Sequence, residues 1–550
     1  MCKCQGTSVM AGVAIGPLHF YQRPARRYVI PPCTDPEAEL ERMEAARKQA
    51  IEQQSVLYEK ALEEAGAEIA AVFEVHALML DDREFVEAIR ENILTHHMHA
   101  EYAVRCAAHA MVDRFADVED EYIRARVDDI MDMARGVIYL LQGGVEETAW
   151  GEPAIIVADE LSPSETVRMD KKKVLGFVTR LGSAISHTSI LARSMELPAL
   201  VAVTDTNPEW EGHIAILDGL HGELIVDPDV DTLIKYRQIQ QEIAHRKKLL
   251  HRLKGCPNET LDGHRVEVWA SVGKREDLES AKENDAGGIG QVQSDYLYVG
   301  QSVAPDEETQ FRFYKELVQA MPHGPVQIST VDWGATNPLQ DLQSPCQKET
   351  NLFYRGIRRS LTNAEEFCVQ IRAMLRAAAL GDVRLILPEV TNVQEVQRAK
   401  ELVEACRQEM IENGVTVGTL QIGILIETPA AVWIADELAE EADFFLIGTN
   451  DLTQYICILD RSNMQDIPYA DLYHPAVMRA IYETIKAGHR HGIPVGIAGA
   501  LCEDTTMAEH FLRMGVDSFT VPSTTVLPLR NCICHLDLRE PASKMPGGKL

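Results

Sequence analysis

The sequence lacks long hydrophobic runs: no uninterrupted apolar stretch approaches the roughly 18 residues that a membrane-spanning helix needs. The first residues, MCKCQGTSVMAGVAIG, also lack the charged region and continuous apolar stretch that mark a secretion signal. These two absences predict a cytoplasmic protein with no membrane insertion.

Basic residues are scarce relative to acidic ones. Lys and Arg number 53 against 84 Asp and Glu, which gives a formal net charge of −31. Such a charge repels the phosphates of nucleic acids and anionic membrane surfaces, and it weakly favours a basic partner. We therefore expect no nucleic-acid partner.

A disulfide framework is missing as well. Twelve cysteines are spaced irregularly over 550 residues, which favours reduced thiols. Two Cys-x-Cys pairs stand out, Cys2 with Cys4 and Cys532 with Cys534, but each is too sparse to be a zinc signature. We expect exposed or half-buried thiols at these pairs.

The chain does contain a regular succession of helical and strand-like patterns, over a length typical of three or four domains. Residues 8–20 predict a glycine-punctuated strand, and residues 35–143 show the apolar spacing of a helical bundle. Strand-like runs return between residues 153 and 228, so the bundle is predicted to be inserted into a small α/β domain. A long polar helix at residues 231–254 is suited to linking domains.

Beyond this helix, apolar strands alternate with amphipathic helices. The predicted strands lie at residues 264–270, 287–293, 326–332, 383–388, 421–427, 443–448, 493–499 and 517–522. Eight such strand-helix steps predict a (β/α)8 barrel, whose chemistry is expected at the C-terminal ends of the strands.

Polar side chains follow two of these strands. The fifth strand ends in IETPAA with Glu427, and the sixth runs into GTNDLTQY with Asn450 and Asp451, after which LDRSN supplies Arg461. Two carboxylates beside an amide and a guanidinium suit a Mg²⁺ ion that bridges to an anionic or phosphorylated substrate. The alternative is that these acids cap helices or form ion pairs outside a barrel.

His187 lies between Ser186 and Thr188 at a predicted helix start, in SAISHTSILARSMELPALV. A phosphoryl group on its ring would meet backbone N–H donors, two hydroxyls and the positive end of the helix dipole. A lone histidine near a helix cap is more often structural, so the residues alone leave both possibilities open.

Together these segments resemble enzyme I of the bacterial phosphoenolpyruvate-dependent sugar phosphotransferase system. The resemblance runs through GVAIGPLHF, VFEVHALMLDD, DDEYIRARVDD, SHTSILARSMELPALV, LDGHRVEVWA, ETPAA and GTNDLTQY. It implies a mixed α/β architecture: a swivelling phosphohistidine α/β domain at 1–20 and 148–230, an inserted helical domain at 21–147, a linker helix at 231–256 and a TIM-type barrel at 257–540. The helical domain would bind the histidine phosphocarrier protein HPr, and the barrel would bind phosphoenolpyruvate and form a homodimer.

The resemblance also implies a role for each matched residue. His187 would take the phosphoryl group from phosphoenolpyruvate and pass it to HPr. Glu427 and Asp451 would bind Mg²⁺. The residues that would contact substrate phosphate or carboxylate are Arg355, Asn450 and Arg461. The helical stretch around His76, Leu78 and Met79 would form part of the HPr-docking surface.

The sequence departs from the family pattern at the barrel mouth. Three cationic positions are replaced by Gln293, Ser329 and Asn337. Ala498 stands where the family has the cysteine acid that protonates the enolate, and Ala500 replaces a glutamate. Cys502 lies four residues beyond Ala498, too far along the chain to substitute simply.

These replacements have a predictable cost. Charge-assisted bonds to Arg contribute roughly 1.5–3 kcal/mol each, and loss of a general acid slows a reaction by about 10²–10⁴-fold. Two hypotheses follow: a phosphoenolpyruvate-protein phosphotransferase that acts through His187, or a degenerate, non-catalytic or regulatory homologue that still binds HPr or exchanges phosphate with it.

Overall fold

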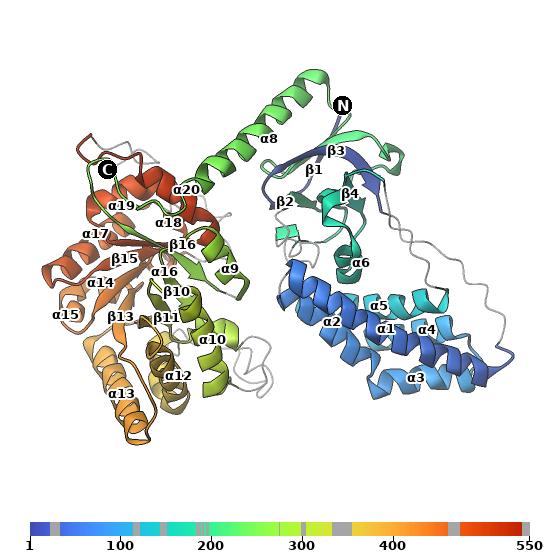
Figure 1. Ribbon diagram of the computed structural model, residues 1–550, viewed down its shortest axis with the longest axis horizontal. Coiled ribbons are helices and arrows are strands. Elements are labelled where there is room, and N and C mark those ends of the chain that lie inside the picture. The colour runs from blue at the N-terminus through green and yellow to red at the C-terminus, as the bar shows by residue number, and fades with distance from the viewer. Residues whose placement is uncertain are drawn as a thin grey trace. The chain divides into compact units, whose positions relative to one another are not determined.

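The computed structural model describes residues 1–21, 33–65, 67–113, 121–143, 151–182, 189, 192–193, 197–273, 275–298, 304–332, 355–459 and 473–541. The chain divides into two compact units, Met1–Arg246 and Lys247–Leu550 (Figure 1). The four functional domain ranges expected from the resemblance stay a prediction, because this division is purely structural.

The first unit contains an eight-stranded sheet in the order β1-β8-β7-β3-β4-β5-β6-β2. Its strands are β1 (Cys2–Gln5), β2 (Thr7–Met10), β3 (Val13–Phe20), β4 (Ala154–Ala158), β5 (Val174–Thr179), β6 (Ala199–Val201), β7 (Ile214–Asp218) and β8 (Glu223–Val226). The single strand predicted at 8–20 is wrong. Gly12, at φ +148°, breaks it, so that β2 pairs with β6 while β3 pairs with β4 and β7.

Five helices form the predicted bundle of the first unit. They are α1 (Pro36–Ala65), α2 (Ala67–Leu80), α3 (Arg83–Leu94), α4 (Ala100–Asp113) and α5 (Glu121–Leu141). The α3 helix shows why they form: Phe85, Ile89 and Ile93 recur at helical spacing and are buried, and the Asp82 side chain accepts the N–H of Phe85 as an N-cap.

Three short elements and one long helix follow. The short elements are α6 (Pro163–Arg168), η1 (Lys171–Lys173) and η2 (Pro208–Trp210). The long helix α8 (Val230–His251) begins in the first unit and extends past its boundary at Arg246. The α8 helix matches the predicted polar helix at 231–254, and Tyr236 is its buried residue.

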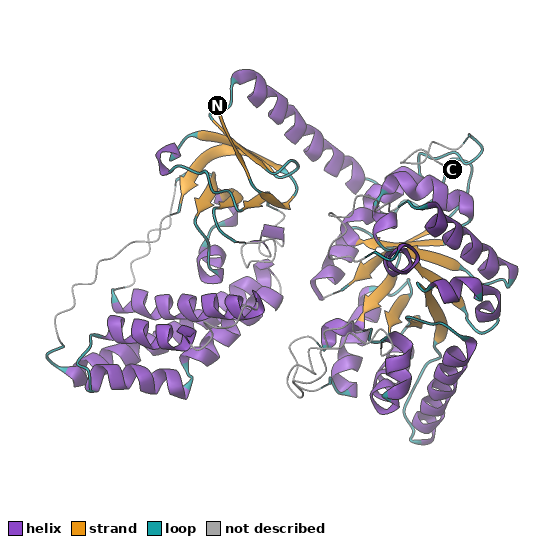
Figure 2. Ribbon diagram, turned by 180° about the vertical axis from the view of Figure 1, so that it is seen from behind, coloured by secondary structure: helices purple, strands orange, loops and turns teal. Residues whose placement is uncertain are grey.

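The second unit is a closed barrel of eight parallel strands surrounded by helices (Figure 2). Its strands are β9 (Glu267–Val272), β10 (Ile289–Gln293), β11 (Val326–Ser329), β12 (Val383–Leu387), β13 (Gln421–Ile426), β14 (Phe444–Gly448), β15 (Val495–Ala498) and β16 (Ser518–Pro522). Because both faces of such strands are covered, they are nearly continuous apolar runs, as in GILI and FFLI. The predicted fold class is confirmed.

Helices and short turns separate the barrel strands. The helices are α9 (Arg275–Glu283), α10 (Glu307–Ala320), α11 (Gly356–Thr362), α12 (Ala364–Ala378), α13 (Val393–Glu412), α14 (Pro429–Trp433), α15 (Ala435–Ala439), α16 (Thr449–Cys457), α17 (Pro475–Arg490), α18 (Ala500–Glu503), α19 (Ala508–Met514) and α20 (Ser523–Ile533). The 3-10 turns are η3 (Ser294–Leu297) and η5 (Thr505–Met507). In the described part of the chain, the helices are all too short or too polar to cross a bilayer.

The barrel core has an outer and an inner layer. Alternate residues of β13 and β14, such as Ile424 and Phe445, pack outward in the large core beneath the helices. The residues between them, Leu425 and Leu446, form a separate buried cluster with Ala498. Since successive strand residues face opposite sides, this smaller cluster fills the barrel interior below the strand ends.

Candidate active site

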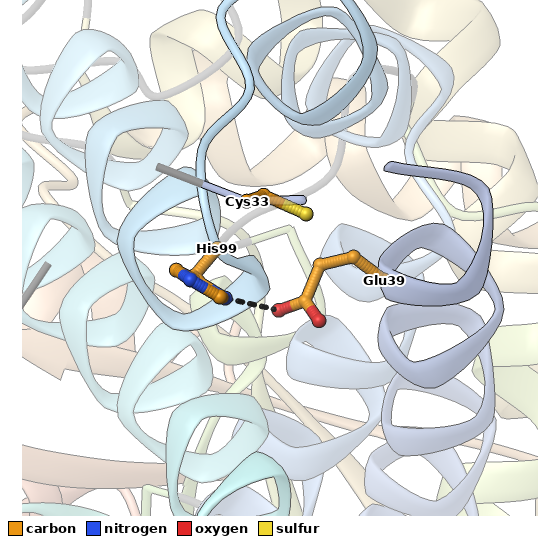
Figure 3. Close-up of side chains that lie close together, drawn as sticks. All are labelled: Cys33, Glu39 and His99. Atoms are coloured by element: carbon orange, nitrogen blue, oxygen red, sulfur yellow. Dashed lines mark hydrogen bonds and ion pairs between the residues drawn. The ribbon is translucent and has the colours of Figure 1, made fainter. Parts of the chain in front are cut away.

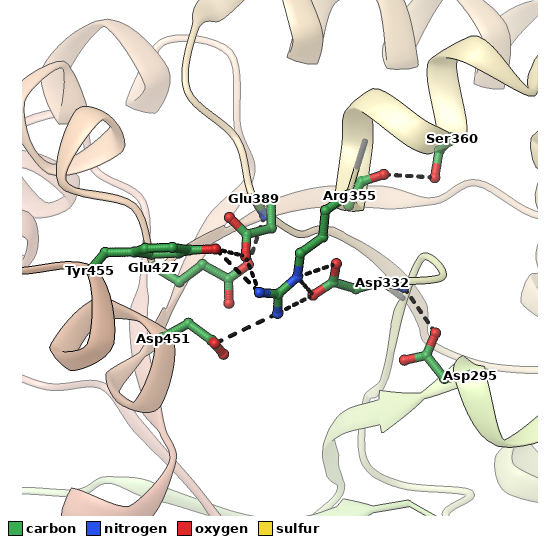
Figure 4. A network of polar contacts seen from close by, with 9 residues as sticks. Asp295, Asp332, Arg355, Ser360, Glu389, Glu427, Asp451 and Tyr455 are labelled. Atoms are coloured by element: carbon green, nitrogen blue, oxygen red, sulfur yellow. Dashed lines mark hydrogen bonds and ion pairs between the residues drawn. The ribbon is translucent and has the colours of Figure 1, made fainter. Parts of the chain in front are cut away.

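Four carboxylates follow four neighbouring barrel strands and meet at the same end of the barrel (Figure 4). Asp332 follows β11, Glu389 follows β12, Glu427 follows β13, and Asp451 lies in the first turn of α16 after β14. We call these four residues the acidic cluster. It lies at the C-terminal ends of the strands, where chemistry is expected in this fold.

Arg355, just before α11, lies in the middle of the acidic cluster (Figure 4). Its Nε is 3.0 Å from Asp332 Oδ1 and its Nη2 is 3.0 Å from Asp332 Oδ2, a bidentate pair. Its other contacts are weaker: Nη1 is 3.2 Å from Glu389 Oε1, and Nη2 is 3.6 Å from Asp451 Oδ1. A planar guanidinium suits this arrangement because its N–H groups can donate hydrogen bonds to carboxylates on several sides.

Local chain geometry fixes the two glutamates. Thr428 accepts the N–H of Ala431 as the N-cap of α14 and Pro429 follows it, so the chain turns directly after Glu427. Glu389 adopts a left-handed conformation with φ +56°, and its backbone N–H donates to Glu427 Oε1 at 2.7 Å. The two acids are therefore coupled through the backbone.

A glycine makes room for Glu389. Gly356 has φ +55°, which disfavours other residues, and a Cβ there would lie 2.5 Å from the Cβ of Glu389. The close approach lets the α11 segment carry Arg355 against the strand ends.

Burial and mutual repulsion raise the pKa values of three of these acids, Asp332, Glu389 and Glu427. Burial raises the pKa of Glu389 to about 7, and the charges of Asp332 and Asp451 add to the effect while Arg355 opposes it. Glu427 is 2% exposed, and burial followed by the charge of Glu389 raises its pKa well above the ordinary range. Burial also raises the pKa of Asp332, against the pull of Arg355. A single guanidinium therefore does not neutralise the cluster.

The donor set fits a hard divalent cation. Asp332, Glu389 and Glu427 each offer a carboxylate oxygen, and these three atoms lie within 4.8 Å of one another. Oxygen-only donors select Mg²⁺, Mn²⁺ or Ca²⁺ over softer metals, and the uncompensated negative charge supplies the attraction.

The structure brings together three of the predicted site residues, two expected metal ligands and one expected substrate contact. Glu427 and Asp451 are members of the acidic cluster, and Arg355 lies between its acids. Asn450 lies beside the cluster in α16, where its Oδ1 accepts the N–H of Ala500 at 2.8 Å. Outside the described residues lie His187, Arg461 and Asn337.

The other replaced positions lie at the strand ends, as predicted. Gln293, Ser329 and Ala498 are the last residues of β10, β11 and β15, and Ala500 begins α18. The Ala498 methyl is buried in the barrel interior, 4% exposed. Cys502 is buried in α18 and its thiol pKa is raised by burial, so it is a poor proton donor at the mouth.

The sequence prediction missed three residues of the site: Asp332, Glu389 and Tyr455. Tyr455 donates to Glu389 at 2.8 Å and accepts from Arg355 at 3.2 Å. Asp332 is the last residue of the predicted third strand and Glu389 directly follows the predicted fourth, so the strand-end rule could have found them. Tyr455 lies inside α16, where sequence position gives no such signal.

One predicted docking residue is corrected by the structure. His76 is completely buried in the bundle, 3.4 Å from Asp129, so it cannot contact a partner. Leu78, on the same helix, is 68% exposed, and Met79 packs partly against the bundle core. Helix periodicity explains the difference, since neighbouring residues face different sides.

Comparisons with known proteins agree with this architecture. Three family models match in succession: "PEP-utilising enzyme, N-terminal" at residues 5–126, "PEP-utilising enzyme, mobile domain" at 150–222 and "PEP-utilising enzyme, PEP-binding domain" at 247–538.

Similar proteins extend over nearly the whole chain. The phosphoenolpyruvate-protein phosphotransferase of Geobacillus stearothermophilus is 34% identical over 98% of this chain and 94% of its own length. Those of Bacillus subtilis and Haemophilus influenzae are 33% and 35% identical, over 99% and 92% of this chain and 96% and 88% of their own lengths. The chain therefore belongs to the phosphoenolpyruvate-protein phosphotransferase family.

Proposed function

We propose that this protein transfers a phosphoryl group from phosphoenolpyruvate to His187 and then to the histidine of HPr, as enzyme I of a sugar phosphotransferase system. The observation that carries the proposal is the acidic cluster with Arg355 at the mouth of a parallel barrel, in a chain of this family. Four carboxylates at strand ends suit a cation that holds a phosphorylated substrate.

Residues of the barrel mouth would bind Mg²⁺ and orient the substrate. Asp332, Glu389 and Glu427 offer oxygens close to one another, and Asp451 Oδ1 lies 3.6 Å from Arg355 Nη2. When bound, Mg²⁺ supplies positive charge for the phosphate oxygens. Arg355, Asn450 and Arg461 would contact substrate phosphate or carboxylate.

The transfer needs a nucleophile and a proton. A ring nitrogen of His187 would bond to phosphorus while the bond from phosphorus to the enol oxygen breaks, and the enolate carbon would then take a proton to give pyruvate. Ala498 offers no proton and Cys502 is buried, so water is the proposed donor. Because a positioned acid contributes about 10²–10⁴-fold, we expect slow turnover.

The partners follow from the same proposal. The exposed Leu78, with neighbouring surface of the helical bundle, would dock HPr, and the net charge of −31 suits a basic docking face on that partner. We also propose a cytoplasmic protein that forms a homodimer through its barrel.

Phosphate labelling tests the proposal. Purified protein with Mg²⁺ receives labelled phosphoenolpyruvate in one reaction and labelled phospho-HPr in another, with His187→Ala as the control. We expect label from both donors and none in His187→Ala. Label from phospho-HPr alone would favour the degenerate alternative that exchanges phosphate with HPr. Label from neither donor would overturn the proposed transfer and leave a binding role.

A second pair of variants locates the donor site. Glu427→Gln removes a member of the acidic cluster, whereas Glu401→Gln changes an exposed acid of α13. We expect Glu427→Gln to lose labelling by phosphoenolpyruvate but to keep labelling by phospho-HPr, and Glu401→Gln to keep both. Equal loss of both labels in Glu427→Gln would contradict the assignment.

A further inference from the structure

A second group of possible metal ligands lies in the helical bundle, in the first unit rather than in the barrel (Figure 3). Cys33 precedes α1, Glu39 lies in the first turn of α1, and His99 directly precedes α4. One ligand atom from each lies within 4.8 Å of the other two. We call these three residues the Cys-Glu-His group.

The backbone holds the three residues together. The N–H of Cys33 donates to the carbonyl of His97 at 2.9 Å, which ties the segment before α1 to the loop before α4. Glu39 Oε1 accepts the N–H of Ala100 at 2.7 Å and lies 3.4 Å from His99 Nδ1. The starts of two helices therefore converge on the group.

The ligand types differ from those of the acidic cluster. A thiolate, an imidazole and a carboxylate are the three protein ligands of zinc, and three such ligands with one open position are typical of a zinc site that also binds water. Ligand atoms of a tetrahedral zinc site are about 3.5 Å apart, so small side-chain rotations would close the group around an ion.

Charge and exposure also suit a cation. The Cys33 residue is 8% exposed, while the His99 side chain is 34% exposed and gives an ion a route from solvent. Burial acts to raise the pKa of Glu39, but hydrogen bonds from Arg42 and from Ala100 hold it below its ordinary value, so the carboxylate is ionised at neutral pH.

Arg42 is the competing cation. Its Nη2 lies 2.6 Å from Glu39 and 2.7 Å from Glu101, and its Nη1 donates to the carbonyl of Leu141 at 3.0 Å. With Glu101 and Leu141 as remaining partners, Arg42 can release Glu39 without losing all its hydrogen bonds. Two carboxylates, Glu39 and Glu101, around one guanidinium leave a net negative charge for a dication.

We propose that Cys33, Glu39 and His99 form a zinc-type metal site that joins the start of α1 to the start of α4. On binding, the Cys33 thiol gives its proton to solvent, and bonds form from the metal to Cys33 Sγ, to a Glu39 oxygen and to a His99 nitrogen, with water in the fourth position. This site is independent of phosphoryl transfer.

Cobalt(II) is the probe, because thiolate-bound cobalt absorbs in the near ultraviolet and oxygen-bound cobalt does not show that band. We expect full-length wild-type protein to develop this band with a stoichiometry of one thiolate-bound cobalt per chain, and zinc to remove it. Cys33→Ser should abolish the band, while Cys106→Ser, a half-exposed thiol of α4 in the same bundle, should keep it.

Two further variants distinguish cobalt binding at the Cys-Glu-His group from loss of the fold and from cobalt binding at the barrel. His99→Gln should weaken cobalt binding by about tenfold or more while the protein keeps its helical circular dichroism. This variant therefore tests the site even where Cys33→Ser does not fold. Glu427→Gln should leave the band unchanged, since it alters the barrel only. A band that survives both Cys33→Ser and His99→Gln, or no band in the wild type, would overturn the proposal.

Discussion

Replacing Glu389 by Gln should stabilise the metal-free protein at alkaline pH. Burial raises the pKa of Glu389 from 4.5 to about 7, and its side chain is 10% exposed. At about 1.4 kcal/mol per pH unit, ionising this carboxyl in the folded protein costs about 3 kcal/mol. Glutamine carries no charge and still accepts hydrogen bonds from Tyr455 and Arg355.

The sign of the pH dependence follows from the raised pKa. A carboxyl with a raised folded-state pKa contributes stability that is fully present below its unfolded pKa and is lost as the pH rises through the folded value. Between pH 5 and pH 8, metal-free wild type should therefore lose about 2–3 kcal/mol that Glu389→Gln does not lose.

Urea unfolding with a chelator present, at both pH values, measures the difference. Glu401→Gln is the matched control, and we expect its stability relative to wild type to be the same at pH 5 and pH 8. Added Mg²⁺ at pH 8 should then stabilise wild type more than Glu389→Gln. An equal difference between wild type and Glu389→Gln at the two pH values would refute the charge argument, and an equal response to Mg²⁺ would refute the role of Glu389 as a ligand.

Three other predictions concern positions around the two units. Gly356→Ala should lower the free energy of unfolding in urea by about 2 kcal/mol or more, because φ is +55° there and the added methyl group would collide with Glu389. The control Gly414→Ala lies at φ +75° with no atom near the added methyl group, so it should lower the free energy of unfolding by the backbone strain alone, about 1 kcal/mol. Cys502→Ala should leave the rate of labelling by phosphoenolpyruvate unchanged while costing about 1 kcal/mol of stability, and a large loss of rate would identify the thiol as the missing acid. Leu78→Ala should weaken HPr binding in calorimetry with no change in melting temperature, whereas His76→Ala should lower the melting temperature of the bundle; the reverse pattern would contradict the exposures of these side chains.

The fold was predictable because each barrel strand is a short apolar run bounded by turn residues. All eight predicted runs overlap the observed strands, since strands buried on both faces leave a strong sequence signal. The break at Gly12 was missed because one glycine inside an alternating run reads equally as a strand interior or as a turn.

The site was only partly predictable for a different reason. Glu427 and Asp451 were found because recognisable motifs carry them. Asp332 and Glu389 lie at equivalent strand ends, but no motif used in the prediction marks them. The position of Arg355 between them depends on tertiary packing and on the close approach of Gly356 to Glu389. The Cys-Glu-His group is still harder to predict from the sequence, because its members are separated along the chain and meet only when two helix starts converge.

The charge balance of the barrel mouth is the physical basis for expecting a metal requirement in the proposed reaction. Phosphoenolpyruvate carries a phosphate and a carboxylate, yet the described mouth offers Arg355 as its central cation, and Asp332 already holds that guanidinium in a bidentate pair. Two of the replaced cationic positions, Gln293 and Ser329, lie at described strand ends and supply no charge. An anionic substrate therefore meets a net negative surface until a divalent cation neutralises the acids. Because these basic side chains are replaced, the proposed function predicts that turnover depends more strongly on metal occupancy than it would with three further basic side chains in place.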